Sequence, residues 1–392
     1  MRHLSTRAWL SAVVAAIGLL LGALPAGQAA AAPAPCGDLT AGTSNGLTLR
    51  NWTVVPDHDG RLCEAELTTG ALFTPRGPGA PQIDPVQKPV RVRVYLPAGY
   101  SPSADYPVLF LLHGGASDYL QWSTAGNIRQ TVADTGFKGI VVMPEGGKSG
   151  FYNDWRGHTY GNFAPLWETF HIKQLVPWVD ANFGTSGTKS GRAIAGVSMG
   201  GYGALKYAAQ YNGLFSAVGD LSGGTDIRRA DHQQIINDGT TSYGARFYKL
   251  GTEGDAGNYW KYLLPDNPGP AERTAAIFGP PGTASVNWES FNPVQVAEKT
   301  PQKYAAYGGK LAIYGGGGKA DGSKGTSGET DVWQWTNNMH QALKAKGVAH
   351  RYCTGPGSHD FTTFTPELKN FISLAYGSGG PACPAGWTTP AG

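Results

Sequence analysis

The residues with the clearest chemical meaning in this chain lie around Ser198. They form the run Gly196-Val197-Ser198-Met199-Gly200, which matches the Gly-x-Ser-x-Gly nucleophile elbow. The run at 192–195 before the motif is short and apolar, and residues 200–209 after it have a helical pattern with a Gly-rich first turn. A strand, a sharp turn and a helix are the context in which such a serine is exposed in a strained conformation. The pattern predicts acyl hydrolysis or acyl transfer through Ser198.

A nucleophilic serine needs a histidine base. In chains with this elbow the order is serine, acid, histidine, so the base should lie late in the sequence. The candidates are His340, His350 and His359. His340 falls inside an expected helix and His350 at a strand start, whereas His359 lies in a loop between a strand and the final helix. Because loops on a rigid scaffold often carry catalytic groups, we expect His359 to be the base.

The base in turn needs an orienting carboxylate, which should follow the strand expected at residues 310–314. Asp321, Glu329 and Asp331 all satisfy this condition. Glu329 is our first choice because it opens an expected helix, which defines its position. A carboxylate at a helix start is also favoured by the helix dipole alone, so Asp321 and Asp331 remain alternatives.

An acyl transfer site also needs two backbone N–H groups to bind the oxyanion. One is expected from Met199, directly after the nucleophile. The other is expected from Gly115, because His113-Gly114-Gly115-Ala116 follows an apolar strand, as the oxyanion turn does in many hydrolases. His113 and Gly114 are therefore candidate substrate contacts, although His113 precedes the serine and is better suited to supporting the turn than to acting as the base.

Short apolar segments alternate with helical ones through most of the chain. Strands are expected at residues 90–96, 108–112, 140–143, 192–195, 217–221 and 310–314. Helices are expected at 167–183, where Pro177 should kink or shorten the helix, and at 332–346 and 368–376. This alternation predicts a mostly parallel central sheet with helices on both faces.

The chain is expected to have one catalytic domain, at residues 88–376. Residues 32–87 contain alternating segments that predict an antiparallel β-hairpin packed on that domain. Residues 223–309 are polar, aromatic and rich in Pro and Gly, and are interpreted as an excursion over the active site. Residues 377–392 form a C-terminal tail.

Residues 1–31 have the features of a secretory signal peptide: Arg2 and Arg7, an apolar run from 8 to 24, and small residues at 29–31. A membrane anchor is the alternative, but the apolar run is short and interrupted. The protein is therefore expected to be secreted, with no stable membrane anchor after cleavage.

The four cysteines agree with export to an oxidising compartment. An even count suggests two bridges, with three possible pairings. We expect Cys36–Cys63 and Cys353–Cys383, because each closes a short loop. The sequence contains no Cys-x-x-Cys motif, so it gives little support for a metal or redox site.

The net charge is only +3, from 31 basic and 28 acidic residues. There is no basic run with interleaved aromatic residues, which argues against a nucleic-acid partner. The expected partner is a small-molecule, lipid or sugar ester. The chemistry described above needs no metal or organic cofactor.

Beyond these motifs, the chain resembles the esterase D superfamily and, within it, the secreted mycolyltransferases of the antigen 85 complex. The similarity extends over residues 90–376 and is most specific in the segment 141–155, which contains Met-Pro-Glu-Gly-Gly and Phe-Tyr-Asn-Asp-Trp. The elbow and the segments 167–170 and 288–293 also fit. The resemblance implies an α/β-hydrolase fold with a serine, an acid and a histidine. It places the acid about thirty residues before the histidine, which favours Glu329.

The chain also departs from the mycolyltransferases. They have Asp-Gly-Leu-Arg where this chain has His113-Gly114-Gly115-Ala116, a cysteine where it has Gly315, and His-Ser-Trp where it has His359-Asp360-Phe361. The charged side chains that help to hold their sugar are therefore missing, and His-Gly-Gly is typical of the hydrolytic esterases of the superfamily.

These observations predict a secreted serine carboxylesterase. Trp155 and Trp260 are added as candidate substrate contacts, from the family-like segment and the excursion respectively. One alternative is an acyltransferase that uses a sugar or another alcohol. The other is a secreted binding protein with this fold and no turnover.

Overall fold

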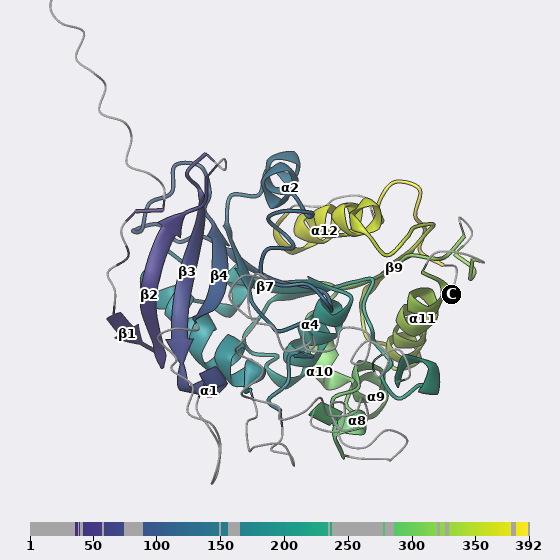
Figure 1. Ribbon diagram of the computed structural model, residues 1–392. Coiled ribbons are helices and arrows are strands. Elements are labelled where there is room, and N and C mark those ends of the chain that lie inside the picture. The colour runs from purple at the N-terminus through teal and green to yellow at the C-terminus, as the bar shows by residue number, and fades with distance from the viewer. Residues whose placement is uncertain are drawn as a thin grey trace, which may run out of the picture. The chain divides into compact units, whose positions relative to one another are not determined.

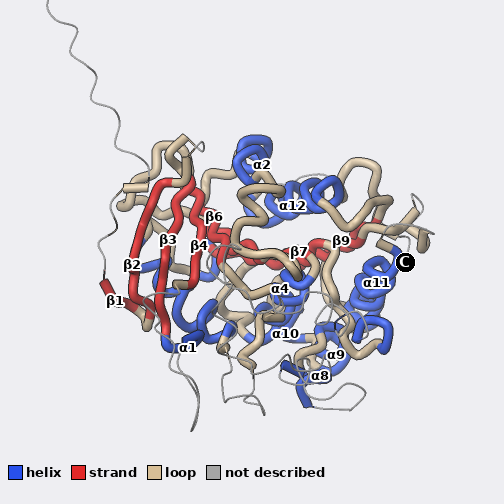
Figure 2. Tube along the Cα trace, viewed as in Figure 1, coloured by secondary structure: helices blue, strands red, loops and turns tan. Residues whose placement is uncertain are grey.

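The computed structural model describes residues 36–37, 39, 42–56, 59–73, 89–148, 150–155, 165–233, 236, 277–278, 286–319, 322–325, 329–377 and 382–390. Its strands are β1 (Gly42–Ser44), β2 (Leu47–Val54), β3 (Leu62–Thr69), β4 (Val90–Tyr95), β5 (Val108–Leu112), β6 (Ile140–Pro144), β7 (Arg192–Val197), β8 (Ala217–Leu221), β9 (Leu311–Gly315) and β10 (Arg351–Thr354). Within the described residues these ten strands form one sheet in the order β1-β2-β3-β4-β6-β5-β7-β8-β9-β10. Figures 1 and 2 show the course of this sheet, with some of its strands labelled.

The sheet is antiparallel at its N-terminal edge and parallel elsewhere. Each pair from β1 to β4 is antiparallel, as is β4 with β6. The strands from β6 through β5 and β7 to β10 are all parallel. Strands β5 to β9 are buried along their whole length, as expected for parallel strands covered on both faces, whereas β4 mostly alternates between buried and half-buried positions. The predicted mostly parallel sheet with an N-terminal antiparallel part is confirmed.

Helices cover both faces of this sheet (Figure 1). The helical elements of the described residues include α1 (Gly70–Phe73), α2 (Ile128–Thr135), η1 (Thr169–Leu175), α3 (Val176–Asn182), η2 (Lys189–Gly191), α4 (Met199–Gln210), α8 (Val286–Ser290), α9 (Pro293–Lys299), α10 (Gln302–Ala305), α11 (Thr330–Ala345) and α12 (Phe361–Tyr376). One apolar core joins α2 and α12 to one face of the sheet, and a second core joins α3, α4 and α11 to the other.

Two helices differ from the sequence prediction. The helix expected at 167–183 is split into η1, a π-helical segment, and α3, in which Pro177 lies in the first turn. Proline is tolerated at that place because its fixed φ suits the first turn of a helix. The last helix starts at Phe361 and not at 368, because Asp360 accepts a hydrogen bond from Thr362 N–H and caps it. Pro366 is accommodated inside this helix.

Two disulfides join Cys36 to Cys63 and Cys353 to Cys383. The second attaches the tail at residues 382–390 to β10. Thr354 and Thr388 exchange two backbone hydrogen bonds of 2.9 Å, and the Trp387 ring packs against Gly355. The tail therefore supports the segment that leads from β10 towards His359.

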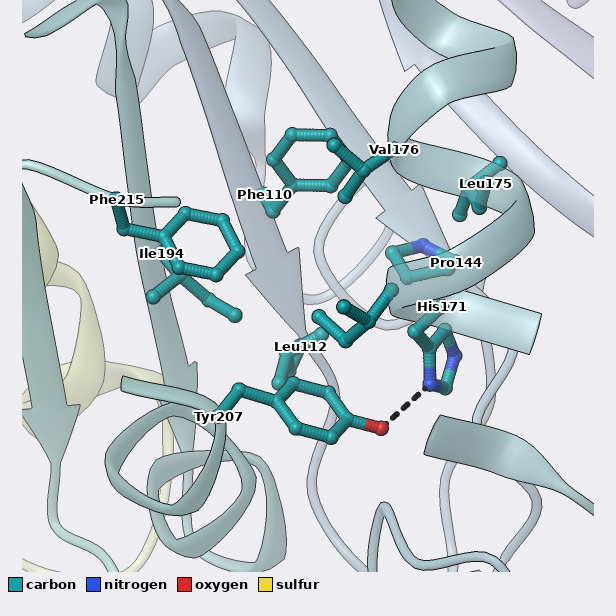
Figure 3. A pocket seen from close by; sticks show the side chains of 10 residues that line it. Phe110, Leu112, Pro144, His171, Leu175, Val176, Ile194, Tyr207 and Phe215 are labelled. Carbon is teal, nitrogen blue, oxygen red and sulfur yellow. Dashed lines mark hydrogen bonds between the residues drawn. The ribbon is translucent and has the colours of Figure 1, made fainter. Parts of the chain in front are cut away.

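An apolar cavity of about 10 Å³ lies between the sheet and the helices η1, α3 and α4 (Figure 3). It is lined by Phe110, Leu112, Pro144, His171, Ile172, Leu175, Val176, Ile194, Tyr207 and Phe215. Ligand sites are generally larger than about 300 Å³, so this cavity is a packing void and not a candidate site.

Several expectations concern residues outside the described ones. They are the signal peptide at 1–31, the central part of the 223–309 excursion with Trp260, and the alternative acid Asp321. Among the described residues, no helix combines the length and apolar character needed to cross a membrane.

Candidate active site

Ser198 occupies a sharp turn between β7 and α4. Its backbone has φ 56° and ψ −118°, a conformation that is unusual for a residue with a side chain. Its N–H donates to Leu221 O over 3.0 Å, which attaches the turn to β8. A β-carbon at Gly200 would lie 2.6 Å from the carbonyl oxygens of Leu112 and His113, so only glycine allows the helix to start this close to β5. This local geometry is that of a nucleophile elbow.

His359 and Glu329 lie together, although they are far apart in the sequence. A hydrogen bond joins His359 Nδ1 to Glu329 Oε1, and the second carboxylate oxygen accepts a 2.8 Å bond from Ser222 Oγ. Glu329 is the N-cap residue of α11, but its fully buried side chain makes no capping hydrogen bond. Asp331 is exposed in the first turn of α11. Of the candidate acids that the structure describes, Glu329 is the one placed to orient His359.

The other two candidate bases lie elsewhere. His340 Nδ1 and His350 Nε2 are 2.8 Å apart and form a hydrogen bond with each other. The imidazole of His359 is in contrast 44% exposed, which leaves its other nitrogen accessible to a reacting group. No hydrogen bond joins Ser198 to His359 within the described residues. In the absence of substrate, catalytic hydrogen bonds are often long and tighten only in the reacting complex.

Gly115 and Met199 face each other beside Ser198. A β-carbon at Gly115 would lie 3.8 Å from that of Met199, and neither backbone N–H has a hydrogen-bond partner in the described part of the chain. Ala116 has a φ of 60° and donates to Lys148 O over 2.7 Å, which holds the turn after Gly115. Two unpaired N–H groups close to the serine are what an oxyanion site requires.

The expectation that His113 contacts substrate is wrong for its side chain. The imidazole is buried, its Nδ1 bonds to Gly114 O at 2.7 Å, and its Nε2 accepts from Gly146 N–H at 2.8 Å. Nδ1 therefore braces the 113–116 turn itself, and Nε2 attaches that turn to the 141–155 segment. Gly114 does lie beside Ser198, since a β-carbon there would be 3.5 Å from the β-carbon of Ser198.

Trp155 is also wrongly assigned as a substrate contact. Its indole is buried and its Nε1–H donates to Gly150 O over 3.0 Å. The ring is part of the core that shapes the 150–155 loop. An aromatic residue in a recognisable segment does not by itself indicate whether it faces substrate or the interior.

Sequence reasoning missed Tyr152 and Lys206, which support the turn at residues 113–116. Tyr152 has a φ of 52° and its hydroxyl donates to His113 O over 2.8 Å. Lys206, on α4, is buried, donates to Tyr152 O over 3.0 Å and pairs with Glu168. Burial lowers the pKa of Lys206, while the Glu168 carboxylate opposes that shift. The sequence signal that could have identified Lys206 was a lysine within the otherwise apolar face of α4.

It also missed two residues behind Glu329, namely Ser222 and Glu367. Ser222 directly follows β8, has a φ of 48°, and its hydroxyl lies between the carboxyl groups of Glu329 and Glu367. For Glu367, the signal in the sequence was a carboxylate at an apolar position of α12, the last helix. Ser222 carried no such signal.

A comparison with known families identifies the family of this chain. The family described as "Putative esterase" matches residues 84–372. This chain belongs to that esterase family. The match includes the whole parallel part of the sheet and all the site residues described above.

Two curated relatives of this chain carry informative names. Esterase Rv1288 of Mycobacterium tuberculosis is 47% identical over 141 residues, which are 35% of this chain and 30% of that protein. The diacylglycerol acyltransferase/mycolyltransferase Ag85B of Mycobacterium leprae is 29% identical over 226 residues, 56% of this chain and 58% of that protein. The chain thus matches less than two thirds of the length of either relative.

Solved structures confirm the α/β-hydrolase fold. An S-formylglutathione hydrolase from Agrobacterium tumefaciens has a TM-score of 0.53 at 14% identity, covering 87% of this chain and 99% of its own. The MPT51 (FbpC1) structure of Mycobacterium tuberculosis has a TM-score of 0.52 at 20% identity, covering 73% of this chain and 92% of its own. At such identities the likeness concerns the fold alone.

Proposed function

We propose that this chain is a serine carboxylesterase. Ser198 attacks the ester carbonyl while His359 removes its proton, and Glu329 orients the imidazole and stabilises its charged form. The N–H groups of Met199 and Gly115 bind the oxyanion. His359 then returns the proton to the departing alcohol, and a water molecule resolves the acyl-enzyme by the same steps in reverse.

The observation that carries this proposal is the hydrogen bond between His359 Nδ1 and Glu329 Oε1. It fixes the tautomer in which Nε2 is the free, basic nitrogen, and that nitrogen belongs to a half-exposed ring. The same sheet edge carries the strained Ser198, because both residues follow the carboxyl ends of parallel strands. Family membership supports the same chemistry.

The nucleophile is tested with Ser198→Ala. We expect ester cleavage to fall on the order of 10⁴-fold or more while the circular dichroism spectrum and Tm stay unchanged. A fluorophosphonate probe should label the native chain and not the variant. Substantial turnover by the variant would refute the assignment, and an unlabelled, inactive native chain would favour a binding protein that has kept the fold.

An acyltransferase is the alternative supported by a specific observation, the similarity to a relative named diacylglycerol acyltransferase/mycolyltransferase. The two activities share every step up to the acyl-enzyme, so the acceptor decides between them. We favour water because the turn His113-Gly114-Gly115-Ala116 lacks the acidic and basic side chains of the mycolyltransferases. Hydrogen bonds to charged groups contribute about 1.5–3 kcal/mol each, so trehalose would be held weakly against bulk water.

Product partitioning separates these activities. With a short-chain aryl ester and excess trehalose, we expect mass spectrometry to detect mostly free acid. Mostly acylated trehalose would make the chain an acyltransferase. The same assay with esters of increasing acyl length would define the substrate class.

We further propose that the protein is secreted after removal of residues 1–31. The apolar N-terminal run and the two disulfides support export. N-terminal sequencing of protein from the culture medium should begin close to residue 32. Retention of the intact N-terminus in a membrane fraction would instead indicate an anchor.

A further inference from the structure

A buried row of hydrogen bonds extends behind the proposed triad. Ser222 Oγ lies 2.8 Å from Glu329 Oε2 and 2.8 Å from Glu367 Oε1. Glu367 is on α12, where it is completely buried. The N–H of Gly316 also reaches Ser222 Oγ, at 3.4 Å. The row therefore links His359, Glu329, Ser222 and Glu367 from four separate elements.

The number of protons limits how this row can be arranged. The Ser222 hydroxyl has one proton and can donate to one carboxyl group only. For both 2.8 Å contacts to be hydrogen bonds, the other carboxyl group must carry a proton and donate it to Ser222 Oγ. Glu329 already accepts from His359, which makes it the group that benefits from being ionised. The remaining proton then belongs to Glu367.

The surroundings of Glu367 favour this assignment. The titratable groups that face it are Glu329, Asp220 on β8 and the Tyr314 hydroxyl on β9. Its Oε2 has no hydrogen-bond partner among the described residues, and neither do the two carboxyl oxygens of the buried Asp220. Burial, together with the charge of Glu329, raises the pKa of Glu367 well above its ordinary range. A second carboxylate charge at this place would be both unsolvated and repelled.

We propose that Glu367 is a positioning residue that remains a neutral carboxylic acid and donates its proton to Ser222 Oγ, so that the Ser222 hydroxyl is turned to donate to Glu329 Oε2. This inference rests on the proposed function of Glu329. The hydrogen bond from Ser222 fixes the orientation of the Glu329 carboxylate, so that its other oxygen faces His359. Because Glu367 is neutral, it adds no second negative charge to the site. Glu367 acts through Ser222 and touches neither substrate nor the reacting atoms.

Three variants of the full chain test this role by activity. Glu367→Gln is neutral and keeps an N–H donor at the same place, so we expect its kcat to stay within about twofold of wild type. Glu367→Leu has no donor, and its kcat should fall about tenfold with little change in KM. When Ser222→Ala is also present, Glu367→Gln and Glu367→Leu should have the same kcat. The reason is that Glu367 acts through the Ser222 hydroxyl, so the effects of substitutions at the two positions are not additive. Tm values identify any variant that does not fold.

The outcomes against the proposal are equally specific. A Glu367→Gln variant as slow as Glu367→Leu would mean that an ionised carboxylate is needed. A fully active Glu367→Leu variant would mean that the residue positions nothing. A difference that persists without the Ser222 hydroxyl would mean that Glu367 acts by another route. Glu66→Gln, on β3 in the antiparallel part of the sheet, is the control for the same chemical change elsewhere and should keep the wild-type kcat.

The protonation state has its own measurement. If Glu367 is neutral, Glu367→Gln leaves the titration midpoint of His359 unchanged, whereas removal of a real charge would lower that midpoint by about 1 pH unit or more. NMR titration of the His359 ring in wild type and Glu367→Gln measures this midpoint without any turnover. It therefore distinguishes failure of this inference from failure of the proposed esterase activity, which Ser198→Ala tests separately.

Discussion

The backbone of Gly316 lies directly against the carboxylate of Glu329: a β-carbon at position 316 would be 2.1 Å from Glu329 Oε2. Gly316 is the first residue after β9, and Glu329 is the N-cap of α11. The end of the strand therefore determines how close the acid can come to the sheet, where it meets Ser222 and His359.

Gly316→Ala should displace this carboxylate. We expect kcat to fall at least about tenfold, because the acid no longer orients the base, and the unfolding free energy to fall by about 1–3 kcal/mol through overpacking. Steady-state kinetics and urea unfolding measure the two effects. Gly213→Ala is the matched control, since a β-carbon there would meet nothing within 4 Å. Wild-type kcat in Gly316→Ala would show that the close approach has no bearing on catalysis.

The identity of the acid can be tested with a pair of variants on one helix. Glu329→Gln keeps the shape but not the charge, so we expect kcat at least about tenfold below that of Asp331→Asn, which alters an exposed carboxylate two residues away. Asp321→Asn completes the comparison. If either aspartate variant is the slower, the acid has been assigned to the wrong residue.

The disulfide Cys353–Cys383 should influence both stability and activity. The pair Cys353→Ser and Cys383→Ser should reduce the unfolding free energy by about 2–4 kcal/mol. It should also lower kcat several-fold, because the tail braces the segment before His359 through Thr354 and Thr388. The control is the double variant Cys36→Ser/Cys63→Ser, which removes the other disulfide, the one attached to β3. This double variant should lower the unfolding free energy and leave kcat unchanged. Equal kcat in both double variants would rule out a link between tail and site.

The buried His171 should make stability depend on pH. Burial lowers its pKa to about 3 from an ordinary 6.5. Below pH 6.5 His171 therefore binds a proton in the unfolded chain, whereas in the folded protein it stays neutral down to about pH 3. The contribution of His171 to the unfolding free energy is complete above pH 6.5 and is lost as the pH falls from 6.5 towards 3.

The variant His171→Gln lacks this titration. The gap in unfolding free energy between wild type and variant should therefore narrow by about 2–3 kcal/mol from pH 7 to pH 4.5, as measured by urea unfolding. A gap that stays constant would mean that the ring is protonated inside the fold. Two hydrogen bonds of His171 account for the remaining difference. One joins the ring to the Tyr207 hydroxyl at 2.9 Å (Figure 3), and the other joins it to the backbone carbonyl of Glu145 at 2.8 Å.

The sequence by itself was enough to predict the α/β class and where the strands of the parallel part lie along the chain. It was also enough to select Ser198, His359 and Glu329 as candidate catalytic residues. These features are local: apolar runs define the strands, and the elbow motif specifies its own turn. The preference for Glu329 over Asp331 was strengthened by the family resemblance, because two carboxylates in one helical turn have nearly the same local pattern.

Only the tertiary structure decided which side chains face the site. His113 and Trp155 were expected to contact substrate, yet both are buried and bonded to neighbouring loops. Glu367 and Ser222 carried no motif, and they meet Glu329 only because β8, β9 and α12 converge behind it. The burial of a side chain and its hydrogen-bond partners depend on packing between elements that are distant in sequence. The residue pattern along one element shows which of its faces is apolar, but not which residues of another element will contact that face.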